Sequence, residues 1–236
     1  MELNKVKWEP SDKELFLKYL RSFKNDEKEA WTRNIINTKL ELLCLTKKTL
    51  DDMVDAIYKG DYKSFLDLEI FDNYESILIY GKLLSYIIDY DEMIHYLDKY
   101  KDVMENWAHV DSLKYNILDK NKSRFIKLSD TYIHSDKEFI RRLGLMILFQ
   151  MVKDKSVLPV IFKTLGKLKN ETAYYVIMMA GWLLSECVIK YLDETLEFIK
   201  HNPELNRKIV NKGIQKCRES RRVSEELKTE LLAYKR

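Results

Sequence analysis

Apolar residues recur along this chain at helical spacing. Leu15, Phe16, Tyr19 and Leu20 follow Ser11-Asp-Lys-Glu14, a sequence typical of a capping box that starts a helix. Ser135-Asp-Lys-Glu138 predicts a second such start, and Asn202-Pro203 places a cap before a first-turn proline. The pattern predicts helices over 28–43, from 49, and over 61–68, 74–90, 91–100, 106–118, 122–133, 135–152, 156–168, 171–190, 193–200 and 203–218, with a last one from Ser224. We find no convincing strand.

The expected helices form pairs that recur loosely every 35 to 45 residues, the size of HEAT-like repeats. Gly (6) and Pro (3) are scarce, which favours long helices over sheets joined by tight turns. We therefore expect an all-α fold of HEAT-like helix pairs. Periodicity alone does not separate a solenoid of such pairs from a globular helical bundle.

The composition says more about the expected cell compartment than about the function. Hydrophobic residues (46%) are numerous enough for a core, and the net charge of +3 is not diagnostic. Three cysteines lie far apart without metal or disulfide spacing, so we expect a reducing, cytoplasmic setting. The chain start lacks a signal-peptide pattern. The longest apolar run, 173–184, is too short to cross a bilayer and predicts a buried helix.

Four residues stand out inside the helical pattern. Trp107 and Asp111 lie one turn apart, so both side chains leave the same helix face. Arg142 and Trp182 follow at roughly repeat-length intervals, which would place them on one concave wall of a solenoid. Simpler interpretations exist: Trp182 could belong to the core, and Asp111 could be a cap or an ion-pair partner of Arg142.

Several neighbouring residues are expected to be structural. His109 lies two residues from Asp111 and so points elsewhere on the helix, and we interpret it as incidental. We expect Trp8 and Trp31 to be packing residues. Tyr174 and Tyr175 could line a groove, although a core position is the more common one for such side chains.

The C-terminal part is basic over 207–222. Its cations are Arg207, Lys208, Lys212, Lys216, Arg218, Arg221 and Arg222, and its one acid is Glu219. Because 208, 212 and 216 recur every four residues, they predict a basic stripe on one helix face, as phosphate binding requires. The alternative is an ordinary solvated helix surface.

The chain resembles the DNA alkylation repair family of HEAT-like DNA glycosylases, the AlkD-like proteins. The matching stretches are Asn106-Trp-Ala-His-Val-Asp-Ser-Leu113, Phe139-Ile-Arg-Arg-Leu-Gly-Leu-Met-Ile-Leu148, Tyr174-Tyr-Val-Ile-Met-Met-Ala-Gly-Trp-Leu-Leu-Ser-Glu186 and Ile214-Gln-Lys-Cys-Arg-Glu-Ser220. The resemblance implies a monomer with a right-handed α-α superhelix (solenoid) of HEAT-like repeats, a single domain over 1–236. Its concave, positive face would hold duplex DNA. The same resemblance implies excision of N3- and N7-alkylated purines without full base flipping, a reaction for which we expect no metal or other cofactor.

The resemblance also implies roles for individual residues. Asp111 corresponds to the catalytic carboxylate, and Trp107 and Trp182 to the aromatic residues that pack against the deoxyribose of the lesion. Arg142, rather than Arg141, corresponds to the arginine that contacts the DNA backbone. The expected DNA-binding residues are Arg141, Arg142, Lys208, Lys212, Lys216, Arg218 and Arg221.

These residue types suit the chemistry. An N3- or N7-alkylated purine is cationic and already a good leaving group, and bond cleavage leaves an oxocarbenium-like sugar. A carboxylate close to that sugar stabilises its charge and can position a water molecule. An indole face attracts a cation with roughly 0.5 to 2 kcal/mol, which would favour a cationic lesion over a neutral base. Arg142 would bind a phosphate and help to keep Asp111 ionised.

One stretch departs from the family pattern. Many relatives carry Gly-x-Arg-x-Pro-x-Leu-Arg where this chain has Cys44-Leu-Thr-Lys-Lys-Thr-Leu-Asp51. Both arginines are absent, and the region 51–75 is rich in Asp and Glu. The alternative to an enzyme is therefore a helical-repeat scaffold that binds DNA or protein without catalysis.

Overall fold

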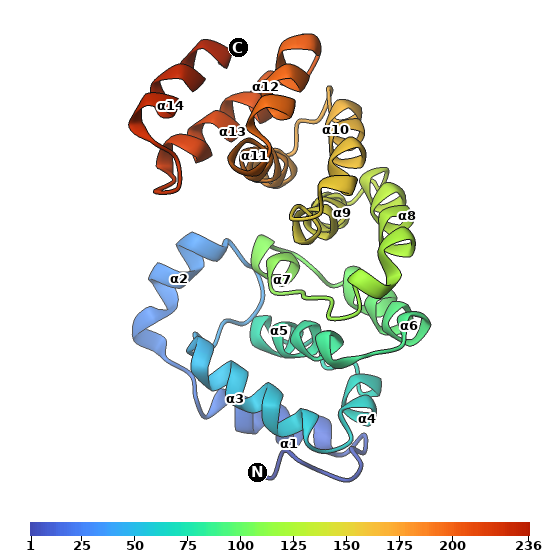
Figure 1. Ribbon diagram of the computed structural model, residues 1–236. Helices are drawn as coiled ribbons and strands as arrows, with labels where there is room; N and C mark the ends of the chain where they lie inside the picture. Colours follow the sequence, from blue (N-terminus) through green and yellow to red (C-terminus); the bar gives the residue numbers. More distant parts are fainter. The chain divides into compact units, whose positions relative to one another are not determined.

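The computed structural model describes residues 1–236, and its regular secondary structure is helical, apart from one isolated bridge between Glu41 and Asn73. Its contacts divide the chain into two compact units, Met1–Lys120 and Asn121–Arg236. The first contains α1 Asp12–Arg21, α2 Glu29–Ile36, α3 Lys47–Tyr58, α4 Tyr62–Asp67, α5 Tyr74–Leu83, α6 Tyr90–Lys101 and α7 Trp107–Asp111 (Figure 1). The second contains α8 Lys122–Ile133, α9 Glu138–Gln150, α10 Leu158–Lys167, α11 Tyr174–Lys190, α12 Leu192–His201, α13 Arg207–Glu219 and α14 Glu225–Glu230.

The second unit is built from repeated helix pairs. Helices α9 and α11 lie side by side in the same direction, because Phe139 packs on Tyr175 and Phe149 packs on Trp182 two turns later. Helix α13 continues this layer beside α11. The alternate helices form a second layer, in which Lys167 of α10 pairs with Asp130 of α8 and Phe162 of α10 stacks on Phe198 of α12. The predicted all-α fold of repeated helix pairs is therefore confirmed in this unit.

The first unit has the same construction. Lys82, in α5, reaches Asp51 in α3, 31 residues earlier, and Tyr86 reaches Asp55 with the same separation. His109 of α7 reaches the carbonyl of Tyr74 at the start of α5, 35 residues earlier. Helices α3, α5 and α7 thus form one layer, whose surface carries the candidate site. The expectation of a single domain over 1–236 stays a prediction.

The interior is apolar, and its aromatic residues only partly match expectation. Trp8 is 2% exposed and packs edge-on against Phe16 and Phe65, as predicted for a packing residue. Trp31 is 68% exposed on α2, so its predicted packing role is wrong. Helix α11 is buried along most of its length, which confirms the buried helix predicted from its apolar run. No helix here combines the length and apolarity that crossing a membrane would require.

Two predicted capping boxes do not form. The Ser11 side chain makes no capping bond, and Asp12 instead accepts a hydrogen bond from the Glu9 amide at 2.9 Å. Helix α9 starts only at Glu138, whose Oε1 accepts from the Tyr175 amide of α11 at 2.8 Å. That carboxylate therefore caps the next helix of its layer, a use that a rule based on local sequence does not foresee.

Other predicted helix bounds also change. Helix α13 begins at Arg207 rather than after Pro203, because Asn206 is its cap and accepts from the Lys208 amide. Helix α2 stops at Ile36, where Asn37 takes a left-handed conformation with φ 54°. The helix predicted over 106–118 is only Trp107–Asp111. The start at Ser224 is confirmed, since its hydroxyl accepts from the Leu227 amide.

Candidate functional site

The four candidate residues divide between the units. Trp107 and Asp111 lie on α7 in the first unit, and Arg142 and Trp182 lie on α9 and α11 in the second. Each pair is described within its own unit.

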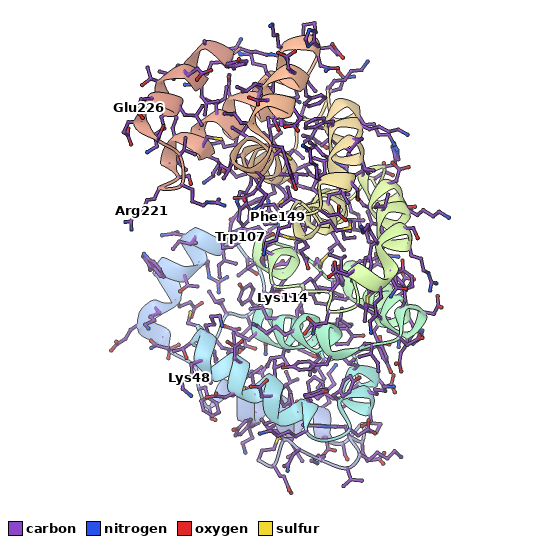
Figure 2. The ribbon with its side chains drawn as sticks, in the orientation of Figure 1. Lys48, Trp107, Lys114, Phe149, Arg221 and Glu226 are labelled. Atoms are coloured by element: carbon purple, nitrogen blue, oxygen red, sulfur yellow. The ribbon has the colours of Figure 1, made fainter.

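Trp107 and Asp111 line one cleft of about 870 Å³ on the face of α3, α5 and α7. Both side chains are half-buried, and the Trp107 Nε1 donates to the Ile35 carbonyl of α2 at 3.4 Å. Figure 2 shows Trp107 and Lys114 around this short helix. An indole edge fixed by a hydrogen bond and a half-buried carboxylate therefore face the same space, which is large enough for a nucleoside.

His109 anchors the helix that carries these two residues. It is fully buried, and its Nε2 lies 3.2 Å from the Tyr74 carbonyl, so Nε2 carries the proton in the neutral tautomer. Tyr100 donates to the His109 carbonyl at 2.9 Å. Burial lowers the pKa of His109 to about 4. The residue that we interpreted as incidental is therefore a structural support of the site.

The cations of this cleft are partly neutralised from within. Asp51 of α3 forms ion pairs with Lys82, at 2.8 Å, and with Lys47. Asp55 accepts from the Tyr86 hydroxyl at 2.7 Å, and burial together with that bond raises the pKa of Tyr86 to about 12. Asp51 stands where the family pattern that the chain resembles has an arginine, and its carboxylate instead engages two lysines.

The loop before α3 also lines the cleft and is held by a buried carboxylate. Glu75 is 1% exposed and accepts hydrogen bonds from the Leu43 amide at 3.0 and 3.1 Å. Burial raises the pKa of Glu75 despite these bonds. Cys44, the next residue, has φ 59°, a left-handed conformation that favours glycine. The family pattern that the chain resembles has a glycine here, which would adopt this conformation without strain, whereas this chain has a cysteine.

In the second unit, Arg142 and Trp182 belong to the seam between α9 and α11. Arg142 is 5% exposed, and its Nη1 donates to the Tyr175 carbonyl at 2.7 Å. Trp182 is half-buried against Phe149, with ring centroids 4.4 Å apart. Because Tyr175 and Trp182 lie two turns apart on α11, the guanidinium and the indole lie along one helix face. Arg142 is more deeply buried than a typical surface phosphate ligand.

Arg141 has a different set of partners. Its guanidinium donates to Glu171, with Nε at 2.7 Å, and to the Ser135 carbonyl at 2.8 Å. Burial tends to raise the pKa of Glu171, but the hydrogen bonds and charge of Arg141, together with the amides of Ala173 and Thr172, outweigh it and the net shift is downward. Arg141 thus ties α9 to the loop before α11, which weighs against a role as a phosphate ligand.

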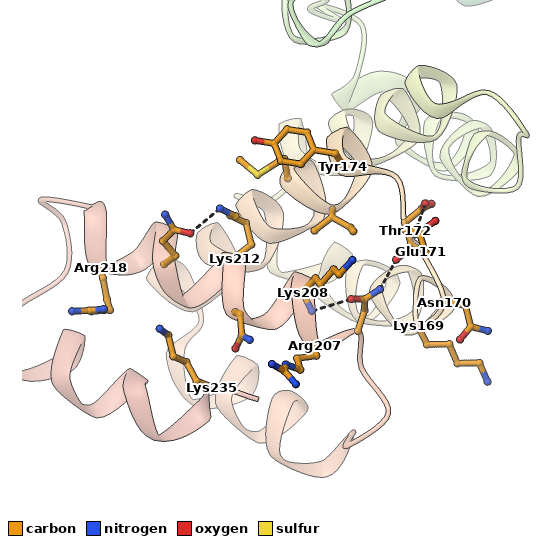
Figure 3. A pocket seen from close by; sticks show the side chains of 15 residues that line it. Lys169, Asn170, Glu171, Thr172, Tyr174, Arg207, Lys208, Lys212, Arg218 and Lys235 are labelled. Atoms are coloured by element: carbon orange, nitrogen blue, oxygen red, sulfur yellow. Dashed lines mark hydrogen bonds between the residues drawn. The ribbon is translucent and has the colours of Figure 1, made fainter. Parts of the chain in front are cut away.

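The basic stripe divides over the surface of α13. Lys208, Lys212 and Arg218 line a cleft of about 1180 Å³ (Figure 3), whereas Lys216 pairs with Glu219 outside it. Residues spaced by four advance about 40° around a helix at each step. A row of such residues therefore winds around the helix and does not stay within a straight groove. Arg221 is exposed beyond the helix (Figure 2), and Arg222 forms an ion pair with the buried Glu186.

Several lining residues of this second cleft were not singled out as DNA ligands from the sequence. They are Lys169, Tyr174, Arg207 and Lys235. Arg207 belongs to the basic segment already noted, but Lys169 and Lys235 lie far from it in sequence. Only the packing of the loop before α11 and of the chain end against α13 brings them together.

Comparison with known proteins identifies a family for this chain. The sequence model of one family, described as DNA alkylation repair enzyme, matches residues 16–217. That range contains all four candidate residues and the whole of the Trp107 cleft. A comparison with curated proteins gives no match. Since the matched range covers most of the sequence, the chain belongs to the DNA alkylation repair enzyme family.

Proposed function

We propose that this protein is a DNA glycosylase that excises cationic N3- and N7-alkylated purines from duplex DNA by hydrolysis of the N-glycosidic bond. The observation that carries the proposal is the presence of Trp107 and Asp111 in one cleft, half-buried and supported by the fully buried His109. Membership of a DNA alkylation repair family supports DNA as the partner. The chain would act in the cytoplasm as a monomer.

In the proposed mechanism, Asp111 acts on the sugar. The alkylated purine departs with the electron pair of the N-glycosidic bond, and the positive charge that develops on C1′ is stabilised by the carboxylate. Water then adds to C1′, with Asp111 positioning it, and loses one proton to solvent to give the abasic sugar. The indole of Trp107 packs on the deoxyribose and favours a cationic substrate. For Trp182 and Arg142 we propose contacts with the deoxyribose of the lesion and with the DNA backbone.

The experiment is an excision assay on methylated duplex DNA with the purified full-length protein. We expect release of 3-methyladenine or 7-methylguanine and an abasic strand that is cleaved only after alkali, since the mechanism uses no lysine nucleophile. Release of neither base, at a protein concentration that saturates the DNA, would rule out the glycosylase.

The second candidate function is a scaffold that binds DNA or protein without catalysis. Its support is the pairing of Lys47 and Lys82 with Asp51, which reduces the positive charge available for phosphates in the first unit. A scaffold would bind duplex DNA, with the usual sensitivity to salt, or a protein partner, and would release no base in the same assay.

A further inference from the structure

Tyr174 is an exposed aromatic residue on the rim of the basic cleft of the second unit. It is 63% exposed in the first turn of α11, a helix that is otherwise mostly buried. Figure 3 shows its ring on the α11 side of the cleft, across from Lys208 and Lys212 of α13. A solvent-exposed tyrosine ring at this position contributes little to the core, and most of its surface is accessible to a ligand.

The ring is held in place from one side. Tyr175 lies against it edge-on, with ring centroids 5.1 Å apart and an interplanar angle of 78°. Tyr175 in turn packs on Phe139 of α9 at 5.3 Å. Met178, one turn further along α11, lines the same cleft. The Tyr174 ring is therefore held by its edge-to-face contact with Tyr175, while much of its surface faces solvent.

The cleft around Tyr174 is positive. Its cations come from a loop, from α13 and from the chain end, and they are Lys169, Arg207, Lys208, Lys212, Arg218 and Lys235. None of them forms an ion pair with a carboxylate, and Lys212 donates instead to the neutral Gln215 at 2.7 Å. The one acid that lines the cleft, Glu171, is engaged by Arg141. The cleft therefore suits a polyanion.

The helix N-terminus beside Tyr174 does not supply the anion site. The amides of Thr172 and Ala173 donate to Glu171, and the amide of Tyr175 donates to Glu138. Recognition of an anion here must therefore come from the lysine and arginine side chains.

We propose that Tyr174 is a nucleoside-contacting residue of the DNA-binding surface. Lys208, Lys212 and Arg218 bind consecutive phosphates of one strand, and the Tyr174 ring packs on the deoxyribose next to them. A strand that alternates phosphates with partly apolar sugars matches a cleft that combines cations with an aromatic face. This inference rests on the proposed function, because it takes duplex DNA as the ligand.

The test is the affinity of the full-length protein for a labelled DNA duplex, measured by fluorescence anisotropy between about 50 and 200 mM salt. We expect Tyr174→Ala to raise the Kd roughly 3- to 10-fold without changing the slope of log Kd against log salt, because packing on a sugar buries apolar surface but releases no counterions. Tyr174→Phe keeps the ring and should bind as the wild type does. Lys212→Ala should instead make the slope shallower by about 0.9.

Unchanged affinity of Tyr174→Ala, in a protein whose Lys212→Ala variant is weakened, would overturn the role of Tyr174 alone. Weaker binding with a shallower slope would also overturn it, since the ring would then act by positioning lysines. Unfolding temperatures of all variants show whether the fold is kept, which the exposure of Tyr174 predicts. Absence of DNA binding by the wild-type protein would overturn the proposed function as well.

Discussion

The imidazole of His109 holds the short helix that carries Trp107 and Asp111. Asn106 caps this helix by accepting from the amides of Ala108 and His109. Because α7 spans only Trp107–Asp111, its own backbone bonds are too few to fix its direction. The geometry of the candidate carboxylate therefore depends on buried side chains around it, and those contacts can be tested separately from catalysis.

A first prediction concerns acid stability. Burial lowers the pKa of His109 from 6.5 to about 4 in the folded chain. The folded state thus binds this proton less readily than the unfolded chain does. The contribution of neutral His109 to stability is therefore complete above pH 6.5 and is lost as the pH falls toward 4, by up to about 1.4 kcal/mol per pH unit. His109→Gln should lower the free energy of unfolding at neutral pH and flatten its pH dependence across this window. Denaturant unfolding at several pH values measures both, and an equally steep dependence in the variant would contradict the account.

At the scale of helices, the closest approach in the second unit lies between α11 and α13. A Cβ added at Gly181 would lie 2.6 Å from Cγ and 2.7 Å from Cβ of Lys212, and 3.2 Å from the Gly213 amide nitrogen. Gly181 precedes Trp182, and Lys212 lines the basic cleft. The same contact therefore positions elements of both candidate surfaces of this unit.

A second prediction follows from this contact. Gly181→Ala should destabilise the protein by about 1–3 kcal/mol, because overpacking outweighs the better helix propensity of alanine. Gly166→Ala in α10 is the matched control, since a Cβ there would meet nothing within 4 Å. That variant should be neutral or more stable by up to about 1 kcal/mol. Thermal unfolding compares the two variants. Equal effects would show that α11 and α13 can move apart without a loss of stability, which would contradict the prediction.

The helices could largely be predicted from the sequence, and their ends could not. Apolar spacing identified the helix over 122–133 and the buried helix that became α11. The starts at Ser11 and Ser135 failed because Asp12 and Glu138 make other hydrogen bonds, the latter to a helix 37 residues away. The prediction for Trp31 was wrong because apolar spacing shows which face of a helix a residue lies on, but not whether another element covers that face.

At the scale of the whole molecule, charge divides unevenly between the two clefts. The cations of the second cleft form no ion pair with a carboxylate, whereas Asp51 engages Lys47 and Lys82 in the first. Family resemblance proposed Trp107, Asp111, Arg142 and Trp182 as site residues from the sequence, and these roles stay predictions. It did not identify Lys169, Tyr174 or Lys235 as neighbours, because their proximity depends on packing between segments far apart in the chain.

A third prediction concerns this charge difference. Asp51→Asn should release Lys47 and Lys82, lower the Kd for duplex DNA, and steepen the salt dependence of log Kd by up to about 0.9 for each new phosphate contact. The neighbouring Asp52→Asn is the control, because Asp52 pairs with Lys48 and lies outside the Trp107 cleft. Anisotropy titrations at several salt concentrations measure both variants. Equal effects of the two substitutions would show that only net charge matters.

The most direct test of the central claim is the single-turnover rate of base release from a duplex with one 7-methylguanine. Asp111→Asn keeps the size of the side chain but removes its charge, so we expect the rate to fall roughly 10²- to 10³-fold with DNA affinity retained. Asp98→Asn removes the same charge from an exposed residue of α6 and should leave the rate unchanged. A rate for Asp111→Asn equal to that of the wild type would contradict the assignment of Asp111 as the carboxylate that stabilises the sugar cation.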